Sequence, residues 1–411
     1  MFNTIDEVYN YLYNQKKLAK RENLDRIKFA KEKLNIKIDY KIIHIAGTNG
    51  KGSTACMIKS MLMLKNLHVG LFVSPFVISF NERIEINDRY ISDAEIMHYA
   101  NILYDFNENY KKEYNDVIPF FELTLLMALM YFEDRKIDIA VIECGLGGLL
   151  DSTNFLDTNL AIITNVGFDH MAQLGNTIED IAYHKLGIIK NNMDCITGVD
   201  SSLMNQFNEY GKEKHAHIIN ICDDVSDIYV NQYTHFKYKG IEYKTNLLGD
   251  YQAYNASIAI EAINYFGGMP YDLIDYALSN LFWPGRMEIV NKDPLVIIDG
   301  AHNIHAMNAL VNFLDKNYKF KFDVIFSALI DKDYKNMIKV LDKITNKYYF
   351  TSISDVRKTD PKDFVLSTNK NFELFDNYVD AYNSAFNKSK AILITGSLHF
   401  ISVLRDYIKN H

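Results

Sequence analysis

A glycine-rich turn between an apolar run and a helical pattern is the feature that most constrains the fold. Residues 42–46 read IIHIA, as expected for a buried strand, and residues 47–53 read GTNGKGS. A helical pattern then extends from Thr54 to about Leu64. Glycines allow backbone amides to converge on one point, and the first turn of a helix adds unpaired N–H groups. The sequence therefore predicts a phosphate-binding loop at the carboxyl end of a strand.

Two side chains of this loop fit a nucleotide. Lys51 supplies a positive charge for the β- and γ-phosphates, and the hydroxyl of Ser53 is placed to reach a magnesium ion. The spelling departs from the common G-x-x-x-x-G-K-[ST], because Gly52 separates the lysine from the hydroxyl. A tight turn with a solvated lysine is the alternative, but the order of strand, lysine and helix favours nucleotide binding. The loop does not identify the reaction, since kinases, GTPases and ligases share it.

Apolar runs alternate with helical patterns over most of the chain, which predicts parallel sheets covered by helices on both faces. The first 40 residues are typical of two polar, amphipathic helices. In a first unit we predict further strands at residues 69–74, 137–144, 160–166 and 195–199, helices at 120–135 and 178–189, and a small antiparallel sheet within 217–248. In a second unit, which begins near Pro294, we predict strands at residues 295–299, 323–328, 348–351, 372–375 and 391–395.

The predicted fold class is therefore α/β, with two domains in series. A Pro-Gly pair at residues 284–285 interrupts both patterns and marks the junction. We predict one domain over residues 1–288 and a smaller one over residues 289–411.

Composition and charge exclude several classes of protein. The formal net charge of −8 argues against a nucleic-acid-binding domain, which is usually basic. The N-terminus lacks the pattern of a signal peptide, and no stretch approaches the roughly 18 apolar residues of a membrane span. Cysteines at 56, 144, 195 and 222 have neither metal-like nor disulfide spacing, and the first three lie in apolar stretches typical of buried thiols. We expect a cytoplasmic protein without membrane or nucleic-acid partners.

Polar residues follow two further predicted strands. Glu143 lies at the end of the strand at 137–144, where a carboxylate points into the ligand crevice and suits Mg²⁺, although it could instead cap a helix. His170 follows the strand at 160–166 and fits a metal ligand, a phosphate contact or a capping residue. Lys185 lies in an apolar helical stretch, which is costly unless the amine is paired, modified or extended to the surface.

An ordered series of motifs resembles a known family. The motifs are GTNGKGS at 47–53, SPF at 74–76, FNERI at 80–84, ECGLGG at 143–148, LDSTN at 150–154, ITNVGFDH at 163–170, HKLGIIK at 184–190, GDYQAYNA at 249–256, WPGRME at 283–288, DGAHN at 299–303, DKD at 331–333 and TGSLHF at 395–400. Together they resemble the folylpolyglutamate synthase and dihydrofolate synthase group of the Mur ligase superfamily. The resemblance implies an N-terminal P-loop ATPase domain of Mur ligase type and a C-terminal Rossmann-like glutamate ligase domain.

The resemblance also implies roles for individual residues. ATP would be bound by Thr48, Asn49, Gly50, Lys51, Gly52, Ser53, Gln252, Asn255, Arg286, Asp299 and His302. The metal ligands would be Ser74, Glu143 and His170. Lys185 would be carbamylated and would complete a catalytic set with Lys51, Glu143 and His170. The pterin-bearing substrate would be bound by Phe121, Leu150, Asp151 and Ser152.

The reaction implied is the ATP-dependent addition of L-glutamate to the γ-carboxylate of a folate through an acyl phosphate. Dihydropteroate is the second carboxylate substrate of the family. The implied cofactors are two Mg²⁺ ions and a monovalent cation, with ATP as co-substrate, and a monomer suffices for a site between two domains. A Mur-type ligase for another substrate and a nucleotide-dependent regulatory switch remain as alternatives. The roughly 40 residues before the phosphate loop are too few for an additional UDP-binding domain.

Three positions in two motifs depart from the family pattern. Leu149 replaces the arginine of the usual GGRLDATN, which removes a charged, multi-donor side chain, and Ser152 replaces its alanine. Asn23 replaces the glycine of a G-L-x-R-I motif that the family links to dihydropteroate. The sequence therefore leaves open whether dihydropteroate is a substrate.

Overall fold

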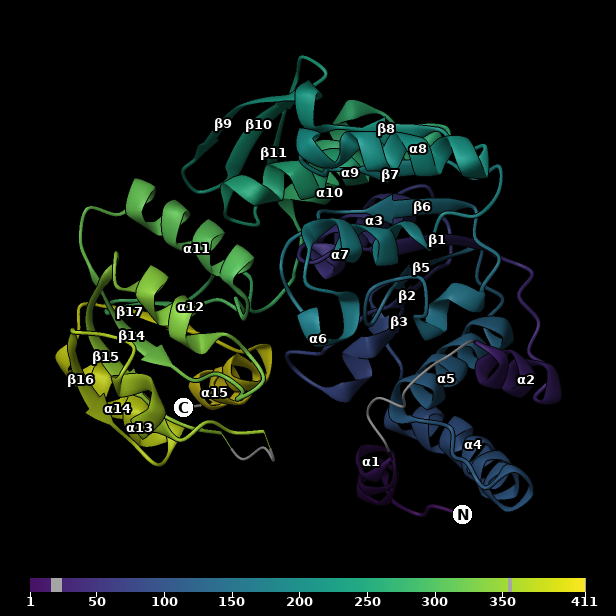
Figure 1. Ribbon diagram of the computed structural model, residues 1–411, viewed down its shortest axis with the longest axis horizontal. Helices are drawn as coiled ribbons and strands as arrows, with labels where there is room; N and C mark the ends of the chain where they lie inside the picture. The colour runs from purple at the N-terminus through teal and green to yellow at the C-terminus, as the bar shows by residue number, and fades with distance from the viewer. Residues whose placement is uncertain (16–23, 354–356, 411) are drawn as a thin grey trace.

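Two α/β units lie side by side in the computed structural model, which describes residues 1–15, 24–353 and 357–410 (Figure 1). The larger unit contains an eight-stranded sheet of order β4-β3-β2-β5-β1-β6-β7-β8. Its strands are β1 Lys41–Ala46, β2 Val69–Phe72, β3 Ile84–Ile86, β4 Arg89–Tyr90, β5 Ile139–Glu143, β6 Leu160–Ile163, β7 Cys195–Thr197 and β8 Ile218–Asn220. The strands from β2 to β8 in this order are parallel, which confirms the predicted parallel sheet.

Two smaller sheets complete the strand framework. The antiparallel sheet predicted within 217–248 is confirmed as β9 Val225–Val230, β10 Thr234–Tyr238 and β11 Ile241–Thr245. The second unit has a six-stranded sheet of order β12-β13-β17-β14-β15-β16. Its strands are β12 Glu288–Lys292, β13 Leu295–Ile298, β14 Phe322–Phe326, β15 Thr345–Phe350, β16 Asn371–Leu374 and β17 Ala391–Thr395. All five strands predicted for this unit are present.

Helices cover both faces of the large sheets. Those of the first unit are α1 Ile5–Asn14, α2 Asp25–Lys33, α3 Lys51–Met63, α4 Asp93–Tyr114, α5 Phe120–Asp134, α6 Met171–Leu174, α7 Ile178–Leu186, α8 Met204–Lys214, α9 Asp250–Tyr265 and α10 Tyr271–Ser279. The second unit contains α11 Ile304–Asn317, α12 Tyr334–Leu341, α13 Pro361–Val365, α14 Tyr378–Lys388 and α15 Leu398–Asn410. Short 3₁₀ turns are η1 Phe80–Arg83, η2 Ser152–Phe155, η3 Ser201–Leu203 and η4 Cys222–Asp224. In the described part of the chain, no helix has the length and apolarity of a membrane span.

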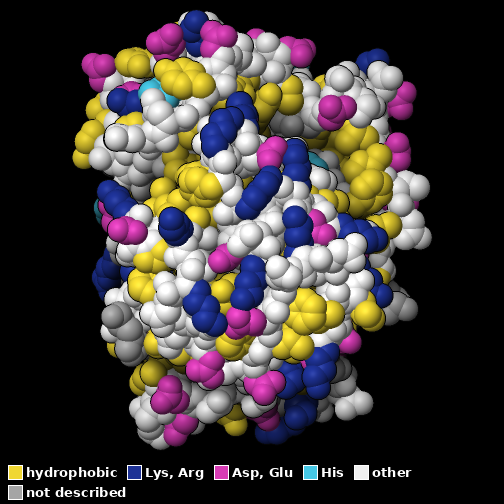
Figure 2. All heavy atoms as spheres, turned by 90° about the vertical axis from the view of Figure 1, so that its left-hand side faces the viewer, with side chains coloured by type: hydrophobic (Ala, Val, Ile, Leu, Met, Phe, Trp, Pro, Cys, Tyr) yellow, Lys and Arg dark blue, Asp and Glu magenta, His cyan; other side chains and the backbone are white. Residues whose placement is uncertain are grey.

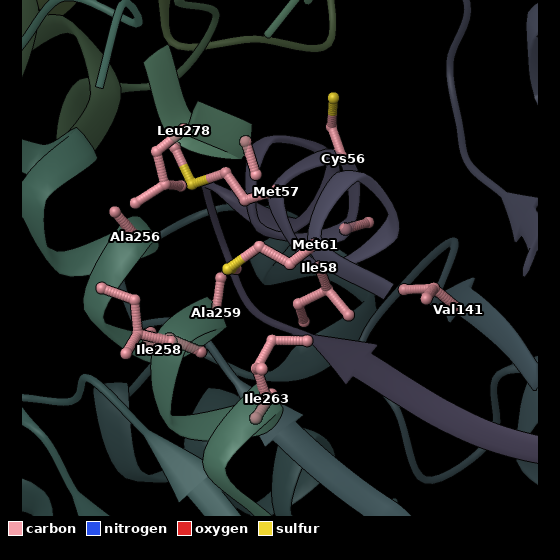
Figure 3. Close-up of a cluster of buried hydrophobic side chains, with 14 of the residues drawn as sticks. Cys56, Met57, Ile58, Met61, Val141, Ala256, Ile258, Ala259, Ile263 and Leu278 are labelled. Atoms are coloured by element: carbon pink, nitrogen blue, oxygen red, sulfur yellow. The ribbon is translucent and has the colours of Figure 1, made fainter. Parts of the chain in front are cut away.

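Alternating strand residues supply two cores. Ile43, Ile45 and Val141 pack with α3, α9 and α10 on one face, whereas Ile42 and Ile142 pack with the N-terminal helices, α4 and α5 on the other. The period of two along a strand produces this division. Figure 3 shows α3 and α9 meeting through methionines on α3 and alanines on α9. Small residues on α9 let the two helices approach closely, and this packing fixes the helix that follows the phosphate loop.

One predicted helix boundary needs correction, and several elements were not predicted. Helix α3 begins at Lys51 rather than Thr54, because Gly50 has a left-handed conformation and acts as its N-cap. The antiparallel strands β3, β4 and β12 were not predicted, since they are short or lie at a sheet edge. Helix α4 was also missed, although its buried residues at 96, 99, 100, 103 and 107 have helical spacing.

A short connection joins the two units, and a partly buried ion pair links it to the last helix. Glu288 accepts the backbone N–H of Gly285 at 2.9 Å and two hydrogen bonds from Arg405, at 2.7 and 2.9 Å. The last helix of the second unit is thereby attached to the connection that follows the first unit. Figure 2 looks onto the second unit and shows basic and acidic side chains interspersed, so positive charge is not gathered into one patch on this face.

Candidate active site

The phosphate loop lies between β1 and α3, and neighbouring loops hold its backbone. The carbonyl of Asn49 accepts the Thr164 hydroxyl at 2.6 Å and the Asn165 amide at 3.1 Å. The Asn165 side chain in turn accepts the backbone N–H of Asn49 at 3.0 Å. Thr164 and Asn165 follow β6, the parallel neighbour of β1, so two strand ends together define the loop. Both residues belong to the ITNVGFDH motif, but their role in holding the phosphate loop was not predicted.

Gly50 and Lys51 show why the loop needs its sequence. Gly50 has φ +82°, and a Cβ atom there would collide with the side-chain amide of Asn255. The ammonium of Lys51 folds back over the loop and donates to the carbonyls of Gly47 at 3.1 Å and Thr48 at 3.4 Å. A cation therefore lies beside the start of α3, where anion binding is already favoured by the helix N-terminus.

Glu143 ends β5 beside this loop and is only 4% exposed. One carboxylate oxygen lies 3.8 Å from the Lys51 ammonium, and the other accepts the backbone N–H of Ser74 at 3.1 Å. Burial raises the pKa of Glu143, while the charge of Lys51 opposes that rise. The three residues predicted to act together at the metal and the phosphates, Ser74, Glu143 and Lys51, are thus adjacent.

His170 is the N-cap residue of α6 and follows the loop after β6. The His170 side chain is 40% exposed, but the surrounding protein desolvates the ring and lowers its pKa to about 4, although the nearby Asp169 carboxylate favours the charged form. The imidazole is therefore neutral near pH 7, and this is the form that ligates metal ions. A neutral histidine and a buried carboxylate form a donor set compatible with a divalent ion.

Lys185 lies on α7 and is 2% exposed. Burial, together with the positive charge of Lys51, lowers its pKa to about 7. No hydrogen-bond acceptor for its amine occurs among the residues that the structure describes. A large fraction of the amine is consequently neutral near pH 7, which makes it a nucleophile. The interpretation of Lys185 as a lysine extended to the surface is wrong.

Gln252 and Asn255 form the wall contributed by α9. Asn255 donates its amide to Gln252 at 2.9 Å, and both side chains are buried. The Gln252 amide nitrogen is buried without a hydrogen-bond partner. An unpaired buried donor is costly, so it marks a place where a ligand acceptor would be stabilising.

The interdomain connection contributes Arg286, and the second unit contributes Asp299 and His302. Asp299 accepts the backbone N–H groups of Met287 and Ala301, both at 2.9 Å, and so links the interdomain connection to β13. Burial raises the pKa of Asp299 and the charge of Arg286 opposes it. Burial also lowers the pKa of His302 to about 4. Its Nδ1 faces the Gly300 carbonyl at 2.9 Å, so the neutral ring carries its proton there and leaves Nε2 as an acceptor.

One cavity between the two units brings all of these groups together. Of the predicted residues, it is lined by Thr48, Asn49, Gly50, Lys51, Gly52, Ser53, Ser74, Glu143, His170, Lys185, Gln252, Asn255, Arg286, Asp299 and His302. Every residue predicted for ATP, metal or modification therefore lines a single cavity. Asp169 and His305 line it as well and were missed as site residues.

The comparisons with known proteins agree with this arrangement. Residues 45–263 match the Mur ligase middle domain, and residues 285–398 match the Mur ligase glutamate ligase domain. The dihydrofolate synthase/folylpolyglutamate synthase of Bacillus subtilis is 34% identical over 430 aligned positions, which cover 100% of both chains.

The chain belongs to the Mur ligase family, in its dihydrofolate and folylpolyglutamate synthase group. It is therefore an ATP-dependent ligase. E. coli FolC in complex with DHPP and ADP has a TM-score of 0.88 to the chain at 25% identity, with 99% and 98% of the two chains covered. A bifunctional folylpolyglutamate synthase/dihydrofolate synthase with Mn, AMPPNP and L-glutamate bound has a TM-score of 0.85 at 26% identity, with coverage of 99% and 98%. ATP and a divalent metal are accordingly the cofactors of this ligase group.

The residues predicted for the pterin-bearing substrate lie outside the lining of the cavity. Phe121 packs beside Gly145, where an added Cβ would lie 2.8 Å from its ring, and Leu150 is 37% exposed. Asp151 and Ser152 are buried. Asp151 accepts the backbone N–H groups of Leu146 and Thr153, at 2.7 and 3.0 Å, and so shapes the loop after Glu143.

Helix α2 of the ligase is linked to this loop through the carboxylate of Glu122 on α5. The Ser152 hydroxyl donates to Glu122 at 3.2 Å, and Arg26 donates two hydrogen bonds to the same carboxylate, both at 2.9 Å. Leu149, which replaces the family's arginine, packs against Gly187 at the end of α7. Asn23 lies outside the described residues.

Proposed function

We propose that this ligase adds L-glutamate to the γ-carboxylate of a folate and also joins L-glutamate to dihydropteroate. One observation carries the proposal most strongly. Lys51, Glu143 and the amine of Lys185, whose pKa burial lowers to about 7, converge on a phosphate loop that the second unit covers with Asp299 and His302. Such a site can hold a nucleotide between the two units.

The proposed reaction begins with nucleotide positioning. Adenine lies against Gln252 and Asn255, where the unpaired Gln252 amide gains an acceptor. The phosphates lie over Lys51 and the start of α3, and Arg286 adds a second cation from the interdomain connection. Asp299 and His302 face the ribose and phosphates from the second unit.

The substrate carboxylate then attacks the γ-phosphorus, and ADP leaves. A bond forms between the carboxylate oxygen and phosphorus while the bond to the ADP oxygen breaks, so the product is an acyl phosphate. The amine of glutamate attacks the acyl carbon, loses a proton, and expels phosphate. Positioning and charge neutralisation supply most of the rate, and closure of the second unit protects the acyl phosphate from water.

Magnesium is the divalent ion in this proposal, and Ser74, Glu143 and His170 are its ligands. A buried carboxylate held between Ser74 and Lys51, with a neutral imidazole nearby, provides suitable donors. When bound, the ion offsets the negative charge of the phosphates. A second Mg²⁺ and a monovalent cation belong to the same proposal.

Lys185 is proposed to be carbamylated. Its neutral amine attacks carbon dioxide, a nitrogen–carbon bond forms, and one proton leaves to solvent. The product is an anionic carbamate in place of a poorly solvated ammonium. The low pKa, the burial and the lack of an acceptor among the described residues support this modification.

The proposal also includes the setting of the enzyme. The chain is divided into an ATP-binding domain at 1–288 and a glutamate ligase domain at 289–411, and it acts as a monomer in the cytoplasm. Free cysteines at all four positions support a reducing compartment.

Transfer of ¹⁸O tests the acyl phosphate. Tetrahydrofolate labelled in its glutamate γ-carboxylate is incubated with ATP and L-glutamate, and phosphate is analysed by mass spectrometry. We expect one labelled oxygen in phosphate for each amide formed. Unlabelled phosphate alongside amide product would exclude the mechanism. Parallel assays with dihydropteroate decide the second activity, and ATP hydrolysis that is independent of both substrates would instead indicate a nucleotide switch.

A further inference from the structure

Asp169 receives contacts from the second unit on both of its carboxylate oxygens. Lys332 donates to one oxygen at 2.7 Å, and the Asn303 amide donates to the other at 2.9 Å. The Nε2 atom of His302 lies 3.6 Å from the same carboxylate. The Asp169 and Lys332 side chains are only 10% and 12% exposed, so solvent screens this ion pair weakly. The pair joins a loop of the first unit to a loop of the second.

Asn303 extends the same network to the phosphate loop. It exchanges two hydrogen bonds with the Asn49 side chain, at 3.0 and 3.3 Å. Its oxygen also accepts the backbone N–H of Ala306 at 2.8 Å and so caps α11. Asn49 further contacts His305 at 2.9 Å. The first turn of α11 is therefore attached directly to the loop that binds phosphate.

The turn that carries Lys332 is itself fixed. Residues 327–333 connect β14 to α12 at the carboxyl end of the strand. The backbone N–H of Ile330 donates to the Arg357 carbonyl at 2.9 Å, and that of Lys332 donates to the Leu329 carbonyl at 3.1 Å. Asp333 then caps α12 through Asn336 at 3.3 Å. Because the turn is held in place, the ion pair can fix the position of Asp169. A lysine on a loosely held loop would instead move with its partner.

We propose that Lys332 is a positioning residue, which clasps the second unit over the phosphate loop through Asp169. The clasp sets the distance between Asp299 and His302 on one side and Lys51 and Glu143 on the other. Asp169 directly precedes His170, so the clasp also orients the loop that presents this proposed metal ligand. Its effect on turnover rests on the proposed ligase reaction, but its effect on domain closure does not.

Replacement of Lys332 tests the clasp. Lys332→Met keeps the length of the side chain and removes its charge, and Lys335→Met on α12 is a matched control with an exposed lysine. We expect Lys332→Met to lower kcat about 100-fold, the loss typical of reactants misplaced by an ångström, with a change in the KM for ATP of less than about threefold. Lys332→Arg should restore most of the activity, because it can re-form the ion pair.

Two further measurements separate a clasp from other roles. In a double-mutant cycle, Asp169→Asn combined with Lys332→Met should lose no more activity than the worse single variant, because both remove one pair. Small-angle scattering without nucleotide should show a larger radius of gyration for Lys332→Met than for the wild type or Lys335→Met.

Several outcomes would overturn the inference. The first is a kcat in Lys332→Met equal to that of the wild type. The second is a double variant whose loss of activity equals the product of the two single losses. The third is an unchanged radius of gyration. If Lys332→Met raised only the KM for glutamate, and Asp169→Asn did not, Lys332 would be a substrate ligand instead. If the wild type forms no glutamylated product, the proposed function fails, while the scattering comparison still decides whether the clasp exists.

Discussion

Two groups of buried polar residues in the first unit differ in how completely their hydrogen bonds are satisfied. In the cavity, the Gln252 amide nitrogen has no partner, and Lys185 is buried without an acceptor among the described residues. In the loop after Glu143, by contrast, Asp151 accepts two backbone N–H groups and the Thr153 hydroxyl at 2.6 Å. Unpaired groups indicate ligand binding, whereas paired groups hold a shape. We expect variants in the cavity to affect catalysis and variants in the loop to affect stability.

Glu143→Ala should have the largest effect on turnover. The variant removes the carboxylate between Lys51 and Ser74, so we expect kcat to fall by about 10³-fold, the upper range for loss of one preorganised electrostatic group. Thermal unfolding should change little, because the buried acid makes few other contacts. Steady-state kinetics and calorimetry check the two expectations. Turnover near the wild-type level would remove Glu143 from the proposed metal site.

Lys185→Met should lower kcat by about 100-fold, since it removes the amine that the proposal carbamylates. For the wild type, ¹³C NMR in labelled bicarbonate should show a carbamate signal that the variant lacks. Lys190→Met is a suitable control, because Lys190 lies after the same helix and contacts Asn154 at 2.6 Å rather than the cavity. A carbamate signal that persists in Lys185→Met would place the modification elsewhere.

The pKa of Lys185 also predicts a pH dependence of stability. Burial lowers this pKa from 10.5 to about 7, so between these values the unfolded chain binds more protons than the folded one. The free energy of unfolding therefore rises with pH across this window, by at most about 1.4 kcal/mol per pH unit, and the cost is full below pH 7. Denaturant titrations in buffer free of carbon dioxide should show this slope in the wild type but not in Lys185→Met. Equal slopes would mean that the folded amine keeps its ordinary pKa.

Gln252→Met should have a smaller, selective effect. It removes the unpaired amide, so we expect the KM for ATP to rise about tenfold, equivalent to roughly 1.4 kcal/mol, with little change in the KM for glutamate. Stability should stay nearly constant, because one unpaired donor is lost while the Asn255 amide loses its acceptor. Nucleotide titration by calorimetry measures the first quantity. Unchanged ATP affinity would separate Gln252 from the adenine end of the site.

Asp151→Ala should affect catalysis least. Three donors lose their acceptor, so the free energy of unfolding should fall by about 1–3 kcal/mol. The KM for ATP should remain within about twofold of the wild type, while the KM for the folate rises a fewfold as the loop loosens. Denaturant unfolding and substrate kinetics check both. A stable variant with a large loss of kcat would show that Asp151 contacts a reactant. The loop after Glu143 would then take part in catalysis, as the cavity does.

Local pattern predicted much of this molecule. The phosphate loop, the parallel strands and the helix that carries Lys185 were predicted because each is set by neighbouring residues. Strands β3 and β12 were missed because their pairing partners, not their own composition, make them strands. The clasp was missed because Asp169 and Lys332 are 163 residues apart, and the two motifs that contain them give no sign of their contact.

The sequence by itself determined the phosphate loop, most of the alternating strands and helices, and the family to which the chain belongs. The loop and these elements follow from periodicity and from glycines at fixed positions, which act over a few residues, whereas the family was indicated by the resemblance of the ordered motifs. Only the tertiary structure decided that Lys185 is buried beside Lys51, that Gln252 has an unpaired amide, and that Lys332 reaches Asp169. Burial and charge pairing depend on which distant segments pack together, and the folding of both units is what brings those segments into contact.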